Sequence, residues 1–428
     1  MEKKYKKIAV EISRYILGLV FIFSGFVKAV DPWGGAYKIQ DYFTAFEFTE
    51  LNFLSLSLSF FQAAVEFGVG ACLLLGIYRR FNAVLVLLIM LFMTPLTLYL
   101  AIENPVTDCG CFGDALVITN WQTFYKNLIL LIAAIIVFMW YRLMPSCFSR
   151  KRYFYPTVWI FLFIVGVSFY CFYYLPVIDF RPYKIGANIP EKMEIPENAE
   201  HDVYDVRLIY SKDGKQKEFT INDYPKGDTT WTFIDSQSHL VKKGFQPPIH
   251  DFTITTADGE EITQDILTDP SYTFLLISQK LEKAKDTNVD KINDIFDYSK
   301  SQKYGFYALT ASLPNAIHEW VENTGAEYPF CKMDEITLKT IVRSNPGLLL
   351  MKDGTIIDKW PNTCLPSANK LNKLIDNANH GKTPAVHNFR TILVLALILV
   401  VPLAGFYLYD SSKRRKKKQK SRREGKKL

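Results

Sequence analysis

Six long apolar runs alternate with polar segments along the chain, and they set its organisation. Each run holds about 18 to 25 residues, which suits a hydrocarbon core of about 30 Å at 1.5 Å of rise per helical residue. The predicted transmembrane helices lie at about residues 8–30, 53–77, 83–102, 124–141, 154–175 and 391–409. Because five of the runs precede residue 180, the pattern predicts an all-α membrane helical bundle in the first part of the chain.

A polar stretch of roughly 200 residues separates the fifth run from the sixth, a size typical of a globular domain. It opens with alternating β patterns at 203–210 and 218–221, joined by a turn at Asp213-Gly214. Further elements are predicted in this order: a strand at 273–278, a helix at 289–299, a strand at 307–310, a helix at 314–324, a helix near Leu338, and a hairpin at 347–360. Alternating strands and helices of this kind indicate an α/β domain.

These patterns divide the chain into six parts. The predicted parts are a four-helix membrane bundle at 1–145, a fifth transmembrane helix at 146–179, a small β-rich segment at 180–245, an α/β domain at 246–386, a sixth transmembrane helix at 387–410 and a basic tail at 411–428.

The positive charges near the ends of the runs predict the orientation in the membrane. Lys and Arg cluster at the N-terminus, at Arg79-Arg80, between residues 142 and 152, and in the tail, where residues 413–427 hold eleven of them. The loop at 103–123 has none. We therefore expect a multi-pass protein of the cytoplasmic (inner) membrane with both termini in the cytoplasm. The loop and the large domain then lie on the outer face, and the tail contacts the lipid bilayer rather than nucleic acid.

Two of the seven cysteines, Cys109 and Cys111, stand one residue apart in that loop. Two thiols at this spacing can close a small ring, and strained disulfides tend to be the labile, exchanging ones. An outer-face loop is also where a disulfide can form and persist. The pair is a candidate redox site, with free thiols, a structural link or half of a metal site as alternatives. No metal is expected, since all six histidines lie beyond residue 200.

Other residues are candidates of a different kind. Glu66 lies near the middle of the second span, where a carboxylate should be neutral, paired or facing a polar cavity. It is either a packing residue or one that handles protons or a quinone. Lys28 and Asp31 close the first span, as an interface anchor would. Cys331 and Cys364 could bond to each other, exchange with the loop pair, or be inert.

The membrane half resembles a known family in a set of residues spread over four helices. These residues are Arg14, Gly18, the run from Phe23 to Lys28, Asp31-Pro32, Glu66, Leu75-Gly76 and the run from Cys109 to Gly113. The segment from about 8 to 143 resembles the DoxX-like superfamily, and more narrowly its MauE branch of methylamine-utilisation membrane proteins. The resemblance implies a four-helix bundle tied to redox or disulfide maturation of an exported protein.

The α/β domain resembles the thioredoxin-like fold of exported, membrane-tethered thioredoxins over about residues 245–376. Pro346 matches the family's cis-proline, so a cis bond and a place in a binding surface are expected there. The resemblance fails where the reactive Cys-x-x-Cys should follow the first central strand, because residues 279–282 are Gln-Lys-Leu-Glu. The domain is therefore expected to bind a partner, or to serve the loop pair, rather than to exchange thiols itself.

The leading hypothesis is a membrane thiol-disulfide oxidoreductase accessory in which Cys109 and Cys111 cycle and Glu66 assists. Its partners would be an exported client protein and a membrane electron donor such as a quinone. A non-enzymatic membrane scaffold or assembly factor with a binding-only thioredoxin-like domain is the alternative. A transporter, suggested by Glu66 and a kink at Pro95, is the third.

Overall fold

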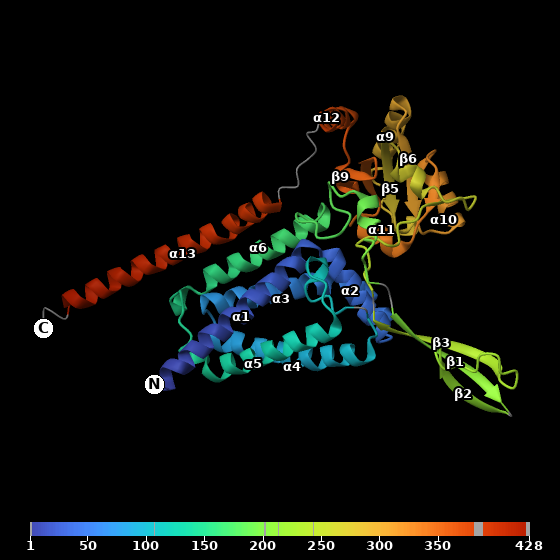
Figure 1. Cartoon of the computed structure of the whole chain (residues 1–428). Helices are drawn as coiled ribbons and strands as arrows, with labels where there is room; N and C mark the ends of the chain where they lie inside the picture. The colour runs from blue at the N-terminus through green and yellow to red at the C-terminus, as the bar shows by residue number, and fades with distance from the viewer. Residues whose placement is uncertain are drawn as a thin grey trace.

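The chain folds into a helical bundle, a small β-sheet and an α/β domain (Figure 1). The computed structural model describes residues 2–106, 108–200, 203–212, 214–242, 244–380 and 388–424. Within these ranges, six helices are long and apolar enough to cross a membrane, and they fall where the six spans were predicted.

The bundle is built around two helices in close contact. Its helices are α1 (Glu2–Val30), α2 (Pro32–Ala45), α3 (Ser55–Leu75), α4 (Arg79–Glu103), α5 (Asn120–Trp140) and α6 (Phe154–Tyr173), with α13 (Asn388–Glu424) beside α6. A Cβ atom on Gly25 of α1 would lie 2.3 Å from the backbone nitrogen of Phe67 in α3. Glycine is needed there because the two backbones approach so closely. The α4 helix continues through Pro95 instead of ending at it.

The short helix α2 was not predicted. Asp31 caps it by accepting a hydrogen bond from the Gly34 amide at 2.9 Å, and Pro32 occupies its first turn. An Asp-Pro pair is a usual start for a helix, so the signal was present in the sequence. The first span therefore ends at Val30 as predicted, and Asp31 begins a new helix.

A three-stranded antiparallel sheet follows the bundle. Its strands are β1 (Val203–Lys212), β2 (Lys215–Thr220) and β3 (Thr232–Lys242), in the order β2-β1-β3. The predicted hairpin is present, since Lys212 pairs with Lys215. Asp213, the first residue of the predicted turn, lies outside the described residues. In Figure 1 this sheet projects away from the other two parts.

The α/β domain holds a six-stranded sheet in the order β4-β7-β6-β5-β8-β9. Its elements are α7 (Ile189–Met193), β4 (Thr255–Thr256), α8 (Thr263–Leu267), β5 (Tyr272–Ser278), α9 (Val289–Gln302), β6 (Gly305–Thr310), α10 (Pro314–Thr324), β7 (Phe330–Lys332), α11 (Glu335–Ile341), β8 (Gly347–Lys352), β9 (Thr355–Pro361) and α12 (Ala368–Asn379). Strand β5 runs parallel to β6 and antiparallel to β8, which forms a hairpin with β9. This βαβ unit followed by a ββα unit is the predicted thioredoxin-like fold. The peptide bond before Pro346 is cis, as predicted.

The core of the α/β domain lies on both faces of the sheet. All seven residues of β5 are buried, which explains the four consecutive apolar residues at its centre, Phe274 to Ile277. Phe274 and Leu276 pack on the side of α9 and α12, while Leu275 and Ile277 pack on the side of α8 and α11. Two covered faces fix the register of the central strand, because a shift by one residue would exchange the two sets.

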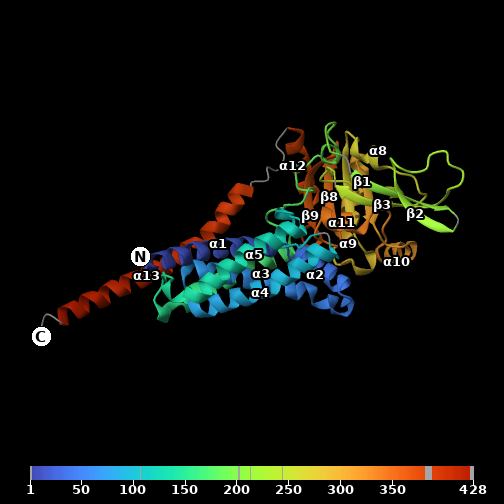
Figure 2. The same cartoon turned by 60° about the horizontal axis from the view of Figure 1, so that its bottom comes forward.

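The α/β domain lies at one end of the bundle, and the chain termini lie toward the other (Figures 1 and 2). We call the first end the domain side; it also carries α2 and the loop residues 104–106 and 108–119. We call the other end the terminal side; it carries the turns at 76–78 and 144–149. The cysteine loop and the thioredoxin-like domain thus share one side of the bundle.

Candidate functional site

Cys109 and Cys111 face each other in the loop between α4 and α5. Their sulfur atoms lie 2.9 Å apart, and both are free thiols. A disulfide has a sulfur–sulfur distance of about 2.05 Å, so closing the bond needs only a small movement of the loop. Cys109 is buried with Leu100 and Val106, whereas Cys111 is partly exposed. The pair is positioned for intramolecular oxidation.

Helix α2 covers this loop and holds its shape. Gly110 has a φ of +65°, and a Cβ atom there would lie 2.5 Å from Cγ of Lys38. Lys38 also forms an ion pair with Asp108 at 3.1 Å. The Tyr42 hydroxyl donates a hydrogen bond to the carbonyl oxygen of Cys109 at 2.9 Å. The tight fit under α2 requires glycine between the cysteines, both for its backbone conformation and for its lack of a side chain.

A buried ion pair lies directly beneath the loop. Nζ of Lys28 in α1 is 2.7 and 2.9 Å from the two carboxylate oxygens of Glu66 in α3. The same ammonium donates to Oγ of Ser24 at 2.9 Å and to the carbonyl oxygen of Cys111 at 3.1 Å. Gln62 donates to Glu66 at 2.9 Å. The structure therefore places Glu66 in a charge pair that extends to the cysteine loop, through a lysine that had been assigned to the interface.

A small cavity of about 50 Å³ adjoins Cys111 within the bundle. Its walls include Lys28, Glu66 and Cys111, together with Phe112 and Lys126. Nζ of Lys126 lies 4.3 Å from the centre of the Phe112 ring. Small-molecule sites usually measure about 300 Å³ or more, so a quinone ring would fit only if the walls moved. Lys126 was missed in the sequence because it stands at the start of an apolar run, where lysines usually act as anchors.

The surroundings of the two thiols make them chemically unequal. The pKa of Cys111 is lowered to about 6, chiefly by the hydrogen bond with the Cys109 thiol. The nearby charges of Lys126 and Lys28 act in the same direction, and burial opposes them. The pKa of Cys109 is raised, first by its bond with Cys111 and then by burial. Cys111 is thus the thiol that ionises first.

We expect Cys111 to react with iodoacetamide as a thiolate at pH 7. Its rate should rise with pH around a midpoint near 6, below the ordinary cysteine value near 8.5, because the thiolate is the reactive form. Mass spectrometry of the peptide that contains both cysteines, over pH 5 to 9, measures this. Lys126→Gln should raise the midpoint, and the matched change Lys151→Gln on the terminal side should leave it unchanged. A wild-type midpoint at 8.5 or above would contradict the assignment.

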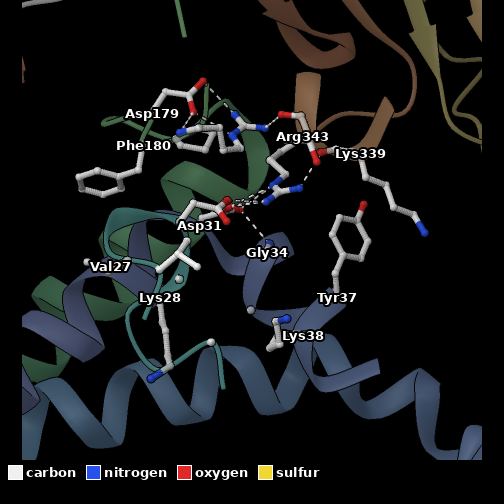
Figure 3. Close-up of a pocket in the computed structure, with 18 of the residues that line it drawn as sticks. Val27, Lys28, Asp31, Gly34, Tyr37, Lys38, Asp179, Phe180, Lys339 and Arg343 are labelled. Atoms are coloured by element: carbon white, nitrogen blue, oxygen red, sulfur yellow. Dashed lines mark hydrogen bonds and ion pairs between the residues drawn. The ribbon is translucent and has the colours of Figure 1, made fainter. Parts of the chain in front are cut away.

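The thioredoxin-like domain is attached to this site by a buried arginine (Figure 3). Arg343, which is 7% exposed, donates to Asp31 through Nη2 at 2.8 Å and through Nε at 3.0 Å. Its Nη2 also lies 3.1 Å from Asp114, three residues after Cys111. Burial, the largest influence, opposes ionisation of Asp31, but the charges of Arg343 and Arg181 outweigh it and lower the pKa of that carboxyl. We call Asp31, Asp114 and Arg343 the latch.

A second ion cluster fixes the segment that leads from α6 to the domain. Asp179 accepts from Nε of Arg181 at 2.8 Å and from Nζ of Lys359 at 2.6 Å. Arg181 also donates to the carbonyl oxygen of Thr340 at 2.9 Å. Burial is the largest influence on Lys359 and lowers its pKa to about 8. The segment between α6 and the domain is therefore bonded to the same region of the domain that carries Arg343 of the latch.

The edge of the domain that carries reactive cysteines in thioredoxins faces the bundle. Gln279, the first residue after β5, donates to the Tyr37 hydroxyl of α2 at 3.0 Å. Arg343 of the latch stands three residues before the cis-proline Pro346. This edge contacts α2, and residues 279–282 there are Gln, Lys, Leu and Glu in place of a Cys-x-x-Cys motif. The candidate binding residue Pro346 is itself buried, three residues after the arginine that contacts the bundle.

The two cysteines of the thioredoxin-like domain lie far apart across its sheet. Cys331 is buried in β7, and Cys364 is exposed just after β9. Three strands separate β7 from β9, and each step across a sheet is about 4.8 Å, so the sulfurs are too far apart for a bond. Both thiols are free. Within the described residues, no group of three or more His, Cys, Asp and Glu side chains is placed to hold a metal ion.

The fold and the site define a multi-pass membrane protein with a thioredoxin-like domain on one side. Residues 6–140, about a third of the chain, match the family model of methylamine utilisation protein MauE. The match covers the membrane part and agrees with the resemblance seen in its motifs. Residues 204–243, which form the small sheet, match a domain of unknown function (DUF8463). A comparison with curated proteins found no match.

Three solved structures similar to this chain each cover about a third of it. A thioredoxin-like protein from Aeropyrum pernix is 16% identical, with 30% of this chain and 89% of that chain covered and a TM-score of 0.24. StoA from Bacillus subtilis is 16% identical, with 29% and 95% covered and a TM-score of 0.23. A thiol peroxidase from Chromobacterium violaceum is 6% identical, with 31% and 86% covered and a TM-score of 0.24. The thioredoxin-like fold is defined here by its strand order and not by these likenesses.

Proposed function

We propose that the protein carries out thiol–disulfide exchange for an exported client through Cys109 and Cys111. The observation that carries this proposal is the 2.9 Å distance between two free thiols of unequal pKa, held over a buried charge pair. A purely structural link would need neither the ionisable Cys111 nor the charged groups around it.

In one half of the proposed cycle, the pair exchanges electrons with the membrane. If a quinol were the donor, it would supply two electrons and two protons to the loop disulfide, leaving the dithiol and a quinone. If the client is a dithiol that has to be oxidised, the same electron transfer runs in the opposite direction. Cys111 borders the cavity inside the bundle, which would have to widen before a lipid-soluble carrier could enter it.

In the other half, the Cys111 thiolate attacks a client disulfide. A mixed disulfide forms and one client thiolate leaves; Cys109 then attacks Cys111 and releases the second client thiolate. Lys28 holds the carbonyl oxygen of Cys111, and Lys126 supplies positive charge near the thiolate. Glu66 keeps Lys28 in place and is, in this proposal, a positioning residue rather than a proton carrier.

The experiment that tests this function is the redox state of the pair in intact cells. Alkylation followed by a mass shift, with and without reductant, should show a mixed population in the wild type. Cys109→Ser should accumulate a mixed disulfide between Cys111 and the client, because the resolving thiol is missing. Cys111→Ser should trap far less, and the exposed cysteine variant Cys147→Ser should behave as wild type. A pair that is always reduced, or always oxidised and resistant to reductant, would exclude the cycle.

A scaffold role is the second candidate, and the thioredoxin-like domain favours it. Its edge at Gln279 lacks cysteine and lies against α2. In a scaffold, Cys109→Ser and Cys111→Ser would leave client maturation intact, while loss of the latch would abolish it. The same redox measurement, combined with an assay of client maturation, separates the two candidates.

We further propose that the termini are cytoplasmic and that the domain side faces outward. Support comes from the positive charges, which gather at the terminal side in the N-terminus, Arg79-Arg80, 142–152 and the tail. Two exposed cysteines, Cys147 on the terminal side and Cys364 on the domain side, provide a test. A membrane-impermeant maleimide added to intact spheroplasts should label Cys364 and spare Cys147 until the membrane is broken. The opposite order of labelling would reverse the orientation.

A further inference from the structure

A second cavity, distinct from the one beside Cys111, lies between the thioredoxin-like domain and the ends of α2 and α6. Its volume is about 400 Å³, within the range of small-molecule sites. Thr363 Oγ1 of the domain donates to the carbonyl oxygen of Tyr173 at 2.6 Å and closes one side. Nothing in the proposed redox cycle uses this cavity.

The charge of the cavity wall is strongly positive. Five cations and one carboxylate line it: Lys280, Lys283, Lys285, Lys339, Arg343 and Glu335. Glu335 pairs with Lys280 at 3.3 Å and with Lys339 at 2.5 Å, and Arg343 belongs to the latch. Among the residues that the structure describes, no carboxylate lies within ion-pair distance of Lys283 or Lys285. The wall therefore has unbalanced positive charge on two exposed lysines.

The opposite wall is aromatic and continues toward the membrane. The ring of Trp33 in α2 stacks on Phe172 of α6, with ring centres 5.6 Å apart. Phe172 contacts Phe60 of α3 at 5.8 Å, and Phe60 contacts Phe169 at 5.1 Å. Phe169 is 49% exposed on the surface of a membrane-spanning helix. Aromatic side chains at the ends of spans occupy the headgroup level of a bilayer.

We propose that this cavity binds the headgroup of an anionic phospholipid from the leaflet on the domain side. The phosphate would lie between Lys283 and Lys285, and the acyl chains would follow the aromatic wall from Trp33 toward Phe169. A soluble phosphate compound would use the lysines and leave the aromatic wall without a role. An acidic peptide would not need a wall that leads into the membrane. The two exposed lysines and the aromatic wall together select a lipid.

The test is native mass spectrometry of the full chain with equal amounts of phosphatidylglycerol and phosphatidylcholine. The wild type should prefer phosphatidylglycerol. The double variant Lys283→Gln/Lys285→Gln should bind it about 30-fold more weakly, about fivefold per lysine, since one basic residue near a lipid surface contributes about 1 kcal/mol. Binding of phosphatidylcholine should not change. The control Lys303→Gln/Lys373→Gln removes two exposed lysines elsewhere on the domain and keeps the basic tail, so it should match the wild type.

Several outcomes would overturn the proposal. One is equal binding of the two lipids by the wild type, and another is equal loss in the control variant. Inorganic phosphate or hexaglutamate that binds the wild type as tightly as phosphatidylglycerol, and loses affinity in the Lys283/Lys285 variant, would reassign the cavity to a soluble anion or an acidic peptide. Melting temperatures of both double variants close to the wild-type value exclude unfolding as the cause.

Discussion

Lys28→Met should lower the free energy of unfolding by about 3 to 5 kcal/mol, because it leaves the carboxylate of Glu66 buried without its cation. The side chains of Lys28 and Glu66 are only 8% and 15% exposed. After the change, the Glu66 carboxylate would keep one hydrogen bond, from Gln62. The carbonyl oxygen of Cys111 would lose the ammonium and keep Ser24 as a donor. Unfolding in mixed micelles, followed by tryptophan fluorescence, measures the effect.

A double-mutant cycle gives this prediction its control. Glu66→Gln alone should cost less, since its amide can still bond to Lys28. The double variant Lys28→Met/Glu66→Gln should be more stable than the sum of the two single changes predicts, as expected for groups in contact. Lys38→Met breaks an ion pair with Asp108 in which both side chains are about a quarter exposed, so it should cost about 1 kcal/mol or less. Equal losses for Lys28→Met and Lys38→Met would contradict the buried pair.

Arg343→Gln should loosen the contact between the thioredoxin-like domain and the cysteine loop. Asp31 would lose the cation that lowers its pKa, at a cost of about 3 to 5 kcal/mol for a buried pair. Hydrogen exchange in α2 and in the loop at 104–119 should become faster by about 100-fold or more if both open locally. At the same time, the redox state of Cys109 and Cys111 should respond to external thiols more quickly.

Two variants and the pH dependence separate this effect from general destabilisation. Asp31→Asn/Arg343→Gln should restore part of the protection, because no charge is then left unpaired. Lys280→Gln removes a half-exposed cation from the same interface and should have little effect. Since the pKa of Asp31 is lowered in the folded protein, its contribution is present above the ordinary carboxyl value near 3.9 and is lost as pH falls below it. Unchanged exchange in Arg343→Gln would show that the latch does not hold the domain.

Together these contacts connect three parts of the molecule that are distant in sequence. The Lys28–Glu66 pair supports the cysteine loop from inside the bundle, and Arg343 contacts Asp114 from above. A movement of the loop would therefore reach Arg343, three residues before Pro346. This arrangement connects the thioredoxin-like domain to the cysteine pair through an ion pair.

Several features of the fold could be predicted from the sequence because they depend on local patterns. Long apolar runs predict membrane-spanning helices, because backbone N–H and C=O groups in lipid must be hydrogen-bonded within the segment. The hairpin at Asp353-Gly354 follows from residues that adopt positive φ, and both do so in the structure. The cis bond at Pro346 followed from the resemblance to thioredoxins. The helix α2 was not predicted, although Asp31-Pro32 marks its start. The apolar run before it ends at Val30, and the residues that follow were interpreted only as the end of the first span at the membrane interface.

The sequence by itself determined the spans, the order of the α/β elements and the adjacency of Cys109 and Cys111, all of which involve neighbouring residues. Only the tertiary structure decided which charges meet. Lys28 and Glu66 are 38 residues apart, and Asp31 and Arg343 are 312 apart. The sequence shows that a charged residue lies in an apolar run and so needs a partner if it is buried. Which residue becomes the partner depends on how the helices and the domain pack. The same packing places Lys126 beside Cys111 and makes one thiol of the pair more acidic than the other.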